Sequence, residues 1–503
     1  FAGANYSHVD GTETWNNENY QFPQSLFDRE SYSKNSYRNH QEYMQFRYQN
    51  QKGKRYWVGK FTLVNLSTPR NVSSGFARES TETNVFSNIR KKSLSPKIDL
   101  NANLPLSKNQ TLTLGVHGKY SANSYHRLYQ EQPFEAMTDE DEKALSFQLS
   151  AIYNYFSQKH SLSVELFHYH DVWNADYSGN CELWQHLWKG ESLAFFSYNF
   201  QASRRLSLKT RIGLDWLQYH LHGDNSFSQL SPRINTNVQY QLNKGMLLWS
   251  FNFVNSNHGM DVINRAMIQI NSHMMEKGMP ELKKSYDINT YLYYMGRFNR
   301  LSVSAIGQFR YNHHPVTDDY YLDEANGKIV KTYSNGGNAQ YYSAILALQY
   351  KLCKFANLSG DIRYNHAEVK TTWSKHNNNL TGNLGLNMFM GDFALKPYLH
   401  FGKKSLDEAA LVISKTPIDY GMSCSYSRGN LYVELQAVSP FKKQEKRYWL
   451  DLPIYSYSKS IKDQTASQYA SIKVAYSFDF GRKTQKVEKD VNKNINSSLL
   501  RVE

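Results

Sequence analysis

Several features that mark other classes of protein are scarce or missing in this sequence of 503 residues. Charged residues make up only 20%, the mean hydropathy is −0.66, and no apolar run is long enough for a transmembrane helix. The three cysteines, Cys181, Cys353 and Cys424, lie far apart and form no C-x-x-C pair. The sequence therefore excludes a membrane-spanning helix and supports neither a zinc site nor a disulfide framework.

The usual enzyme motifs are also missing. The sequence contains no G-x-S-x-G, no H-E-x-x-H, no Walker loop and no dinucleotide-binding fingerprint. We therefore expect neither an enzyme nor a bound cofactor. Aromatic residues, in contrast, reach 15%, with 38 tyrosines, and apolar residues reach 40%. This composition is too apolar and aromatic for a disordered chain.

The strongest positive signal is an alternation of apolar and polar residues. A β-strand points successive side chains to opposite faces, so such a segment has one apolar face and one wet face. The alternating segments have about 9 to 13 residues, which exceeds the about 5 to 6 of soluble strands and suits the crossing of a bilayer. The clearest are Pro96–Leu104, Leu206–Trp216, Ile234–Leu242, Leu384–Met390 and Ala470–Phe480.

Two kinds of connection alternate between these segments, nine short turns and ten longer polar stretches. Nineteen connections join twenty strands, and strict alternation places every short turn at one end of the sheet. The first expected strand is Phe1–Val9 and the last is Tyr469–Phe480. The short turns are Asn50–Lys54, Pro105–Gln110, Ser157–His160, Ala202–Arg205, Leu242–Gly245, Gly296–Arg300, Lys351–Asn357, Met390–Asp392 and Ser427–Asn430. The long stretches include Gly11–His40, Thr68–Lys92, Val172–Gly190, Asn255–Lys284 and Pro440–Ser467.

Together these patterns predict an all-β fold, a large antiparallel transmembrane β-barrel of about 20 strands. Charged residues on the polar faces would be costly in a dry core, but a wet lumen removes that cost. A bilayer accommodates the outer apolar face, and closure leaves no unpaired strand edge. The competing interpretation is a soluble all-β protein, such as a propeller or an array of β-sandwiches. Pro397 lies within an expected strand and should cause a bulge.

The alternation also assigns side chains to the two faces of the barrel. Replacing Leu214 with arginine should cost about 2–4 kcal/mol, whereas replacing Arg211 with serine should cost little because its water remains. The residues expected to face lipid are Ile212, Leu214, Leu386, Val474 and Phe478, and those expected to face the lumen are Lys209, Arg211, Asn387 and Lys473.

Short segments of the chain resemble a known family. Leu230–Ile234, the turn Leu242–Gly245 and Leu247–Phe251 resemble the late barrel of TonB-dependent receptors. Gly278–Asp287 resembles the G-N-P-x-L-x-P-E segment that these receptors place before a long strand. The match is partial, since methionine stands at position 279 in place of asparagine and lysine at position 284 in place of proline.

The end of the sequence resembles a related family. The strand Ser471–Gly481 and the basic polar tail after it resemble the outer-membrane β-barrel family related to TonB-dependent receptors. The general pattern of alternating strands and connections resembles these families over most of the chain, whereas motifs are shared only over short stretches. We expect residues 1–481 to form the barrel and residues 482–503 to form a polar periplasmic tail.

The resemblance implies an outer-membrane location, and it bears on the strand number. Receptors of this kind have about 22 strands and an N-terminal plug domain in the lumen. One interpretation is therefore that two strands and a plug belong upstream of Phe1, and the other is a smaller barrel without a plug. A continuous ladder between Ala2–His8 and Ala470–Phe480 would favour the smaller barrel, and an open seam would favour the first interpretation.

Histidines gather at the expected tops of strands and are weak candidates for metal binding. His168 and His170 are spaced so that both rings lie on one side of a strand, as are His220 and His222. Each pair could supply half of a transition-metal site. Histidine is also a frequent polar residue at barrel rims, and we favour that interpretation and expect no metal.

Three tryptophans are candidates for ligand binding. Trp173, Trp184 and Trp188 lie in or beside one long polar stretch. Aromatic rings on outer loops can stack on sugar rings or hold an apolar ligand. The alternative, which we favour, is that they pack loops together or belong to the membrane-interface belt.

The charge balance indicates the kind of partner. The net charge is +14 and is spread along the chain in short groups such as Arg90–Lys92. No compact basic domain accompanies these groups, so we expect no nucleic acid. The expected partners are outer-membrane lipid and anionic lipopolysaccharide around the outer rim. The resemblance adds an upstream plug domain and the TonB system, and a surface lipoprotein is a further candidate.

Two functions are compatible with these patterns. The resemblance implies an outer-membrane receptor for uptake of a specific nutrient, with the ligand bound at the outer loops and upper lumen and passage driven by the TonB system. The alternative is a plug-free porin or a structural scaffold barrel without energy coupling. The coding sequence upstream of Phe1 distinguishes them, because a plug domain there supports the receptor and a signal peptide supports the plug-free barrel.

Overall fold

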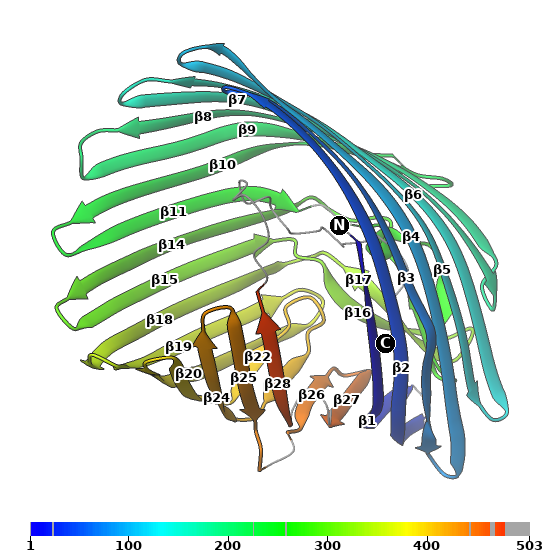
Figure 1. Ribbon diagram of the computed structural model, residues 1–503. Coiled ribbons are helices and arrows are strands. Elements are labelled where there is room, and N and C mark those ends of the chain that lie inside the picture. Colours follow the sequence, from blue (N-terminus) through cyan, green and yellow to red (C-terminus); the bar gives the residue numbers. More distant parts are fainter. Residues whose placement is uncertain are drawn as a thin grey trace.

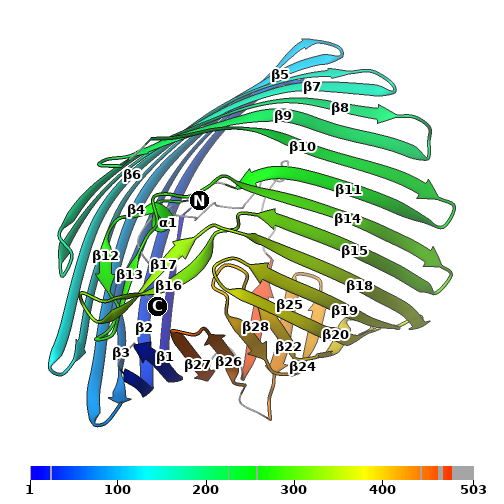
Figure 2. The same cartoon turned by 180° about the vertical axis from the view of Figure 1, so that it is seen from behind.

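The chain forms a large curved sheet that surrounds a small one (Figure 1). The computed structural model describes residues 2–22, 25–224, 226–256, 259–441, 444–462 and 468–477. The large sheet has 24 strands, and the separate four-stranded sheet lies inside its curve (Figure 2). Within the described residues, no helix has the length and apolar character needed to cross a membrane.

The strands of the large sheet are β1 (Ala2–Phe22), β2 (Ser25–Lys52), β3 (Arg55–Arg78), β4 (Glu82–Ser107), β5 (Gln110–Glu131), β6 (Phe134–Phe156), β7 (His160–Gly179), β8 (Leu183–Gln201), β9 (Leu206–Leu221), β10 (Ser226–Leu242), β11 (Gly245–Ser256), β14 (Ser285–Phe298), β15 (Leu301–His313), β18 (Asn338–Cys353), β19 (Ala356–Lys370), β20 (Ser374–Met390), β21 (Phe393–His400), β22 (Lys403–Leu406), β23 (Ile413–Thr416), β24 (Asp419–Arg428), β25 (Leu431–Val438), β26 (Lys446–Asp451), β27 (Tyr455–Lys462) and β28 (Tyr469–Tyr476). The small sheet contains β12 (Met267–Gln269), β13 (Met274–Lys277), β16 (Thr317–Asp323) and β17 (Lys328–Ser334), and one short helix, α1 (Met260–Ile263), precedes it.

We call one crossing of the sheet, from the turns at one end to the connections at the other, a span. The 24 strands of the large sheet make up 20 spans, because each of the last four spans is divided into two strands. These are β21 with β22, β23 with β24, β25 with β26, and β27 with β28. Neighbouring spans pair antiparallel in chain order. The expected count of about 20 and the antiparallel barrel-type sheet are therefore confirmed.

All nine predicted short turns are present, and each joins two strands that pair as a hairpin. Because the spans follow one another around a single antiparallel sheet, these nine turns lie at the same end. We call this the turn end, and the opposite end the loop end.

Four of the stretches expected to be loops form strands instead, and the described part of one of them, Pro440–Ser467, contains the paired strands β26 and β27. Gly11–His40, Thr68–Lys92 and Val172–Gly190 continue the hairpins β1–β2, β3–β4 and β7–β8. The loop prediction was wrong because polar composition does not prevent strand pairing. Ladder hydrogen bonds hold the backbone, and cross-strand contacts such as Trp15 against Tyr32, with ring centroids 4.6 Å apart, support the side chains.

The strands β1–β8 are consequently much longer than a bilayer requires. They contain 19 to 28 residues each, against the about 9–11 residues of a tilted membrane strand. This sector forms a tall wall that rises beyond the other strands (Figure 1).

Pro397 does not cause the expected bulge. The pairs Gly385–Tyr398 and Met388–Leu395 keep one register on either side of the proline, and only the pairs between them are missing. Proline removes a donor from this ladder, but no residue is inserted, so the strand continues without a shift.

The assignment of faces agrees with the structure where the residues are described. Ile212, Leu214 and Val474 are 48%, 52% and 63% exposed on the outer surface. On the inner surface, Arg211 forms an ion pair with Glu165 at 2.6 Å. Lys473 lies over the ring of Tyr432 and Asn387 lines an inner hollow, while Phe478 and the expected tail 482–503 lie outside the described residues.

Within the described residues, the large sheet is joined to itself at the loop end only. β27 pairs with β1 from Glu13–Lys462 to Tyr20–Tyr455. Among the described residues, β28 pairs with β25, and no ladder joins it to Ala2–His8. The first and last spans of the sheet are therefore hydrogen-bonded to each other at the loop end, and their described residues are not paired with each other toward the turn end.

The outer surface makes a prediction about stability. Replacing Leu214 with arginine should destabilise the barrel by about 2–4 kcal/mol, because a charge then faces the hydrocarbon. The control, Ser304→Arg on the inner surface, should cost less than about 1 kcal/mol because that side stays wet. Urea titration of barrels refolded into lipid vesicles measures both, and equal losses would contradict the assignment of faces.

Candidate functional site: the luminal roof

Two long connections at the loop end fold into the lumen and build the small sheet. The connection between β11 and β14 contributes α1, β12 and β13, and the connection between β15 and β18 contributes β16 and β17. They meet where β13 pairs in parallel with β17, from Met274–Ile329 to Glu276–Lys331. We call the residues 259–284 and 314–337 the luminal roof (Figure 2).

Apolar packing attaches the roof to two separate sectors of the barrel wall. On one side, Ile263, Ala266, Ile268 and Leu282 of the roof pack against inward-facing residues of β6–β9, namely Ala144, Trp173, Ala175, Tyr177, Leu187, Tyr219 and Leu221. On the other side, Met274, Tyr320 and Ile329 pack against Tyr20, Ala339, Val369, Leu411, Val412, Leu450, Leu452 and Tyr455. Two apolar clusters thus join the roof to the wall on two sides of the lumen, because burying these side chains is favourable.

The segment that resembles a receptor motif is an anchor of this roof. A Cβ atom on Gly278 would lie 2.2 Å from the backbone oxygen of Asn264, so no larger residue fits without moving the backbone. The next residue, Met279, donates its backbone N–H to the oxygen of Val262 at 2.6 Å. Leu282 then enters the apolar cluster. The motif therefore folds the α1 connection tightly back on itself.

A buried polar node holds the α1 connection to β6–β8. The side-chain nitrogen of Asn264 donates to the hydroxyl of Tyr177 at 2.5 Å, and that hydroxyl donates to Glu140 at 2.8 Å. Gln185 donates to the side-chain oxygen of Asn264. Burial and the nearby Glu140 carboxylate raise the pKa of Tyr177, so its hydroxyl stays protonated as a donor.

Arg29 is the centre of a second buried network, which includes three carboxylates and one hydroxyl of the wall. Its side chain is 3% exposed. The guanidinium lies 2.6 Å from Glu131, 3.4 Å from Glu18 and 3.4 Å from Glu79, and it donates to the hydroxyl of Tyr129 at 3.2 Å. Burial alone would raise the pKa of Glu131, but the hydrogen bond and charge of Arg29 outweigh burial and lower it.

The roof joins this network through the turn between β12 and β13. Arg29 donates to the hydroxyl of Ser272 at 3.2 Å, and Ser272 donates to Glu131 at 3.1 Å. His273 contacts Glu79 at 2.7 Å. Nearby, Arg127 of β5 donates to the backbone oxygens of Gln269 at 2.8 Å and Ile270 at 2.6 Å. Two arginines of the wall therefore fix the position of one roof turn.

A third charged group lies within the roof itself. Lys331 of β17 lies 3.3 Å from Glu276 of β13 and 3.4 Å from Asp318 of β16. Burial raises the pKa of Asp318 to about 6; Lys331 opposes this increase and Glu276 adds to it. Two buried carboxylates thus share one ammonium group, and the raised pKa of Asp318 allows this carboxyl to gain a proton as the pH falls through about 6.

The four histidine candidates lie on the outer surface, above the apolar belt. His168 is within hydrogen-bonding distance of Ser192 at 2.9 Å, and His220 of Ser226 at 3.1 Å. Within the described residues, no three His, Cys, Asp or Glu side chains come together as a metal site. The expectation that these weak candidates, His168, His170, His220 and His222, bind no metal stays untested.

The three tryptophan candidates are divided between the two surfaces. Trp173 faces inward and is buried in the apolar cluster beneath the roof. Trp184 faces outward against His186 and His222, and Trp188 faces outward against His170. Only Trp173 therefore belongs to the candidate site.

The residues that organise the roof were not found from the sequence. Arg29 and Tyr129 are 100 positions apart, and Arg29 and Ser272 are 243 positions apart. No local signal pointed to Arg29, because it lies in Gly11–His40, a stretch that was expected to be a loop.

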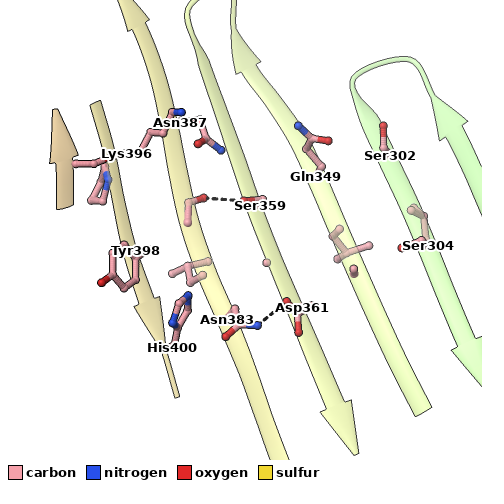
Figure 3. Close-up of a pocket in the computed structure, with 18 of the residues that line it drawn as sticks. Ser302, Ser304, Gln349, Ser359, Asp361, Asn383, Asn387, Lys396, Tyr398 and His400 are labelled. Carbon is pink, nitrogen blue, oxygen red and sulfur yellow. Dashed lines mark hydrogen bonds between the residues drawn. The ribbon is translucent and has the colours of Figure 1, made fainter. Parts of the chain in front are cut away.

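Nearer the turn end, the inner wall has a polar hollow of about 640 Å³ (Figure 3). Asn383 donates to Asp361 at 2.9 Å, and Ser359 donates to the backbone oxygen of Gly385 at 3.2 Å. Its other labelled side chains are Ser302, Ser304, Gln349, Asn387, Lys396, Tyr398 and His400. This lining of amides and hydroxyls is typical of a hydrated lumen.

The Arg29 network makes a prediction about stability. Replacing Arg29 with glutamine should destabilise the barrel by about 3–5 kcal/mol, because buried carboxylates lose their cation. The control is Arg78→Gln on the neighbouring strand, whose half-exposed pairs with Glu82 and Glu30 should contribute less than about 1 kcal/mol. Urea titration of both variants in lipid measures the free energy of unfolding. Similar losses in the two variants would show that burial of the Arg29 network adds nothing to the stability of the barrel.

The raised pKa of Asp318 makes a prediction about pH. If the roof opens, this carboxyl becomes hydrated and returns to its ordinary pKa near 4. The docked roof then binds more protons between about pH 4 and 6, so docking weakens as pH rises through about 6. Amide exchange of β16 and β17 should give an opening free energy about 1 kcal/mol larger at about pH 5 than at about pH 7.5.

The control for this prediction is Asp318→Asn, which cannot titrate. Its opening free energy should not change over the same range of pH. If the variant keeps the slope of the natural protein, another group must be responsible.

Comparison with known proteins supports the fold. No model of a protein family matches the sequence, and no curated protein matches it either. Among solved structures, the copper transporter OprC gives a TM-score of 0.57 at 10% identity, and the siderophore receptor PirA from Pseudomonas aeruginosa gives 0.52 at 12%. The ferric enterobactin receptor PfeA from Pseudomonas aeruginosa, solved as a mutant in complex with enterobactin, gives 0.53 at 11%. Each match covers 90% of this chain and 80% or 81% of the other chain. The chain therefore has the β-barrel fold of these outer-membrane receptors and transporters.

Proposed function

We propose that this chain is the barrel of an outer-membrane receptor for uptake of a specific nutrient ligand. The ligand binds at the loop end, above or within the luminal roof, and passage is driven by the TonB system. The neighbours in fold are, by their names, a copper transporter and receptors for siderophores. Metal ions and their chelates are therefore the first ligand class to test.

The observation that carries this proposal is the wall-anchored roof. A receptor needs an ordered surface at the loop end that binds one ligand and opens for its passage. The roof is ordered by two apolar clusters and by Arg29 and Arg127. It also contains a charged group, Lys331 with Glu276 and Asp318, whose balance a bound ligand or a proton can change.

The alternative function is a passive porin or a structural barrel without energy coupling. A porin requires a continuous water-filled path through the lumen. The apolar core that joins the roof to opposite parts of the wall argues against such a path at the loop end. The two functions therefore differ in the conductance of the isolated barrel and in the energy dependence of uptake.

Conductance tests the closure of the roof. The natural chain in a planar lipid bilayer should show few openings, and the double variant Arg29→Gln, Arg127→Gln should conduct more because its roof turn is no longer fixed. The control Arg78→Gln should behave like the natural chain, since the ion pairs of Arg78 among the described residues are with Glu30 and Glu82 and none is with the roof. Steady large conductance in the natural chain would favour the porin.

Uptake tests the receptor function itself. Cells that contain or lack the full-length protein should differ in accumulation of radiolabelled iron, supplied as ferric enterobactin, or of copper ion. The difference should disappear when the TonB system is deleted. Uptake that persists without TonB would support the passive alternative, and no difference with either probe would exclude this ligand class.

A further inference from the structure

The cross-strand register arranges the outward side chains of the tall wall in rows. The last apolar row contains Met44, Leu63, Pro96, Tyr120 and Leu145, which are neighbours from β2 to β6. Above it, toward the loop end, every step of two residues gives the next outward row. The first two steps reach Glu42 and then His40 on β2, and Leu94 and then Lys92 on β4.

The third step above the apolar row brings three arginines together. Arg38 of β2 is the register partner of Arg70 of β3. On the other side of β3, the register shifts between Thr68 and Asn71, and this bulge leaves Arg70 next to Arg90 of β4. Lys92 lies one outward position below Arg90. We call these four residues the basic row.

No acidic residue in the described part of the chain neutralises the basic row. All four side chains are exposed, and none of them forms an ion pair with another described residue. Three nearby carboxylates have other partners: Glu30 pairs with Arg78, Asp139 with His126, and Glu42 accepts a hydrogen bond from Asn65 at 3.2 Å. Like charges opposite each other destabilise a sheet, so an anion bound here would be stabilising.

The height of the basic row indicates which anion it meets. Arg38 lies six residues beyond Met44, about 20 Å along the strand. With a strand tilt of about 35–45°, this places the arginines roughly 15 Å above the last apolar row. The head-group layer of an ordinary bilayer is only about 5–8 Å thick on each side, so the basic row lies beyond it, at the level of the larger phosphorylated saccharide head group of lipopolysaccharide. Guanidinium groups bind phosphate oxygens in pairs.

We propose that Arg38, Arg70, Arg90 and Lys92 form a binding site for the phosphorylated head group of lipopolysaccharide. The site holds a lipid on the outside of the tall wall, where the strands rise beyond the membrane. The inference requires only that the barrel lies in the outer membrane. Failure of nutrient uptake would leave it intact, and its own failure would leave the uptake proposal intact.

Binding of purified lipopolysaccharide to the detergent-solubilised chain, measured by native mass spectrometry, tests the site. The variant Arg38→Gln, Arg70→Gln, Arg90→Gln should bind about a hundredfold more weakly, because each basic residue near an anionic head group raises the affinity about fivefold. The matched control, Arg204→Gln, Arg205→Gln, Lys244→Gln, removes the same charge from exposed positions at the turn end. It should bind like the natural chain, and slower gel migration after heating verifies folding of each variant.

Two further probes identify the group that is recognised. Lipopolysaccharide stripped of its phosphates should bind the natural chain as weakly as intact lipopolysaccharide binds the triple variant. Inorganic phosphate at millimolar concentration should not displace intact lipopolysaccharide. Equal binding by the triple variant and the natural chain, an equal loss in the control, undiminished binding without phosphates, or full displacement by inorganic phosphate would each overturn the proposal.

Discussion

The need to pair every backbone N–H and C=O group in a medium without water governs this molecule. An antiparallel ladder that follows the chain around a ring meets that need with local hairpins, and its period of two separates lipid from lumen at every residue. The outward apolar belt, the inward charges such as Arg211 with Glu165, and the position of every short turn depend on this ladder. Even Pro397, which removes one donor, leaves the register unchanged.

The ladder also explains why the barrel is uneven in height. Once a hairpin is started, adding a pair of residues costs little if both side chains find neighbours, and β1–β8 continue far beyond the membrane. Their inward residues there are no longer needed to line a wet channel. Tyr20, Tyr177 and Leu187 instead provide an apolar surface, and the connections around α1 and β16 fold inward to cover it.

Buried charge gives the roof its specific position. Apolar contacts alone would tolerate several positions of the roof. Arg29 and Arg127, in contrast, can donate hydrogen bonds only to roof oxygens that lie at the correct places. The same feature makes the roof suited to switching, because removal of one charged partner leaves another unsatisfied in a dry environment. A ligand or proton that changes the balance of charge around Lys331 therefore acts on a roof whose position depends on a few strong contacts.

Local patterns in the sequence were enough to predict the class of fold, the nine short turns and the facing of strands such as Leu206–Trp216, because alternation and turn residues are local properties. The resemblance to a receptor segment also singled out Gly278–Asp287. The length of the tall wall, the roof and the basic row arise only when distant strands and loops come together. Arg29 meets Ser272 across 243 positions, and Arg70 comes into the same outward row as Arg38 and Arg90 only through the bulge in β3. Such contacts depend on register and on the folding of distant loops into the lumen, and no local pattern records them.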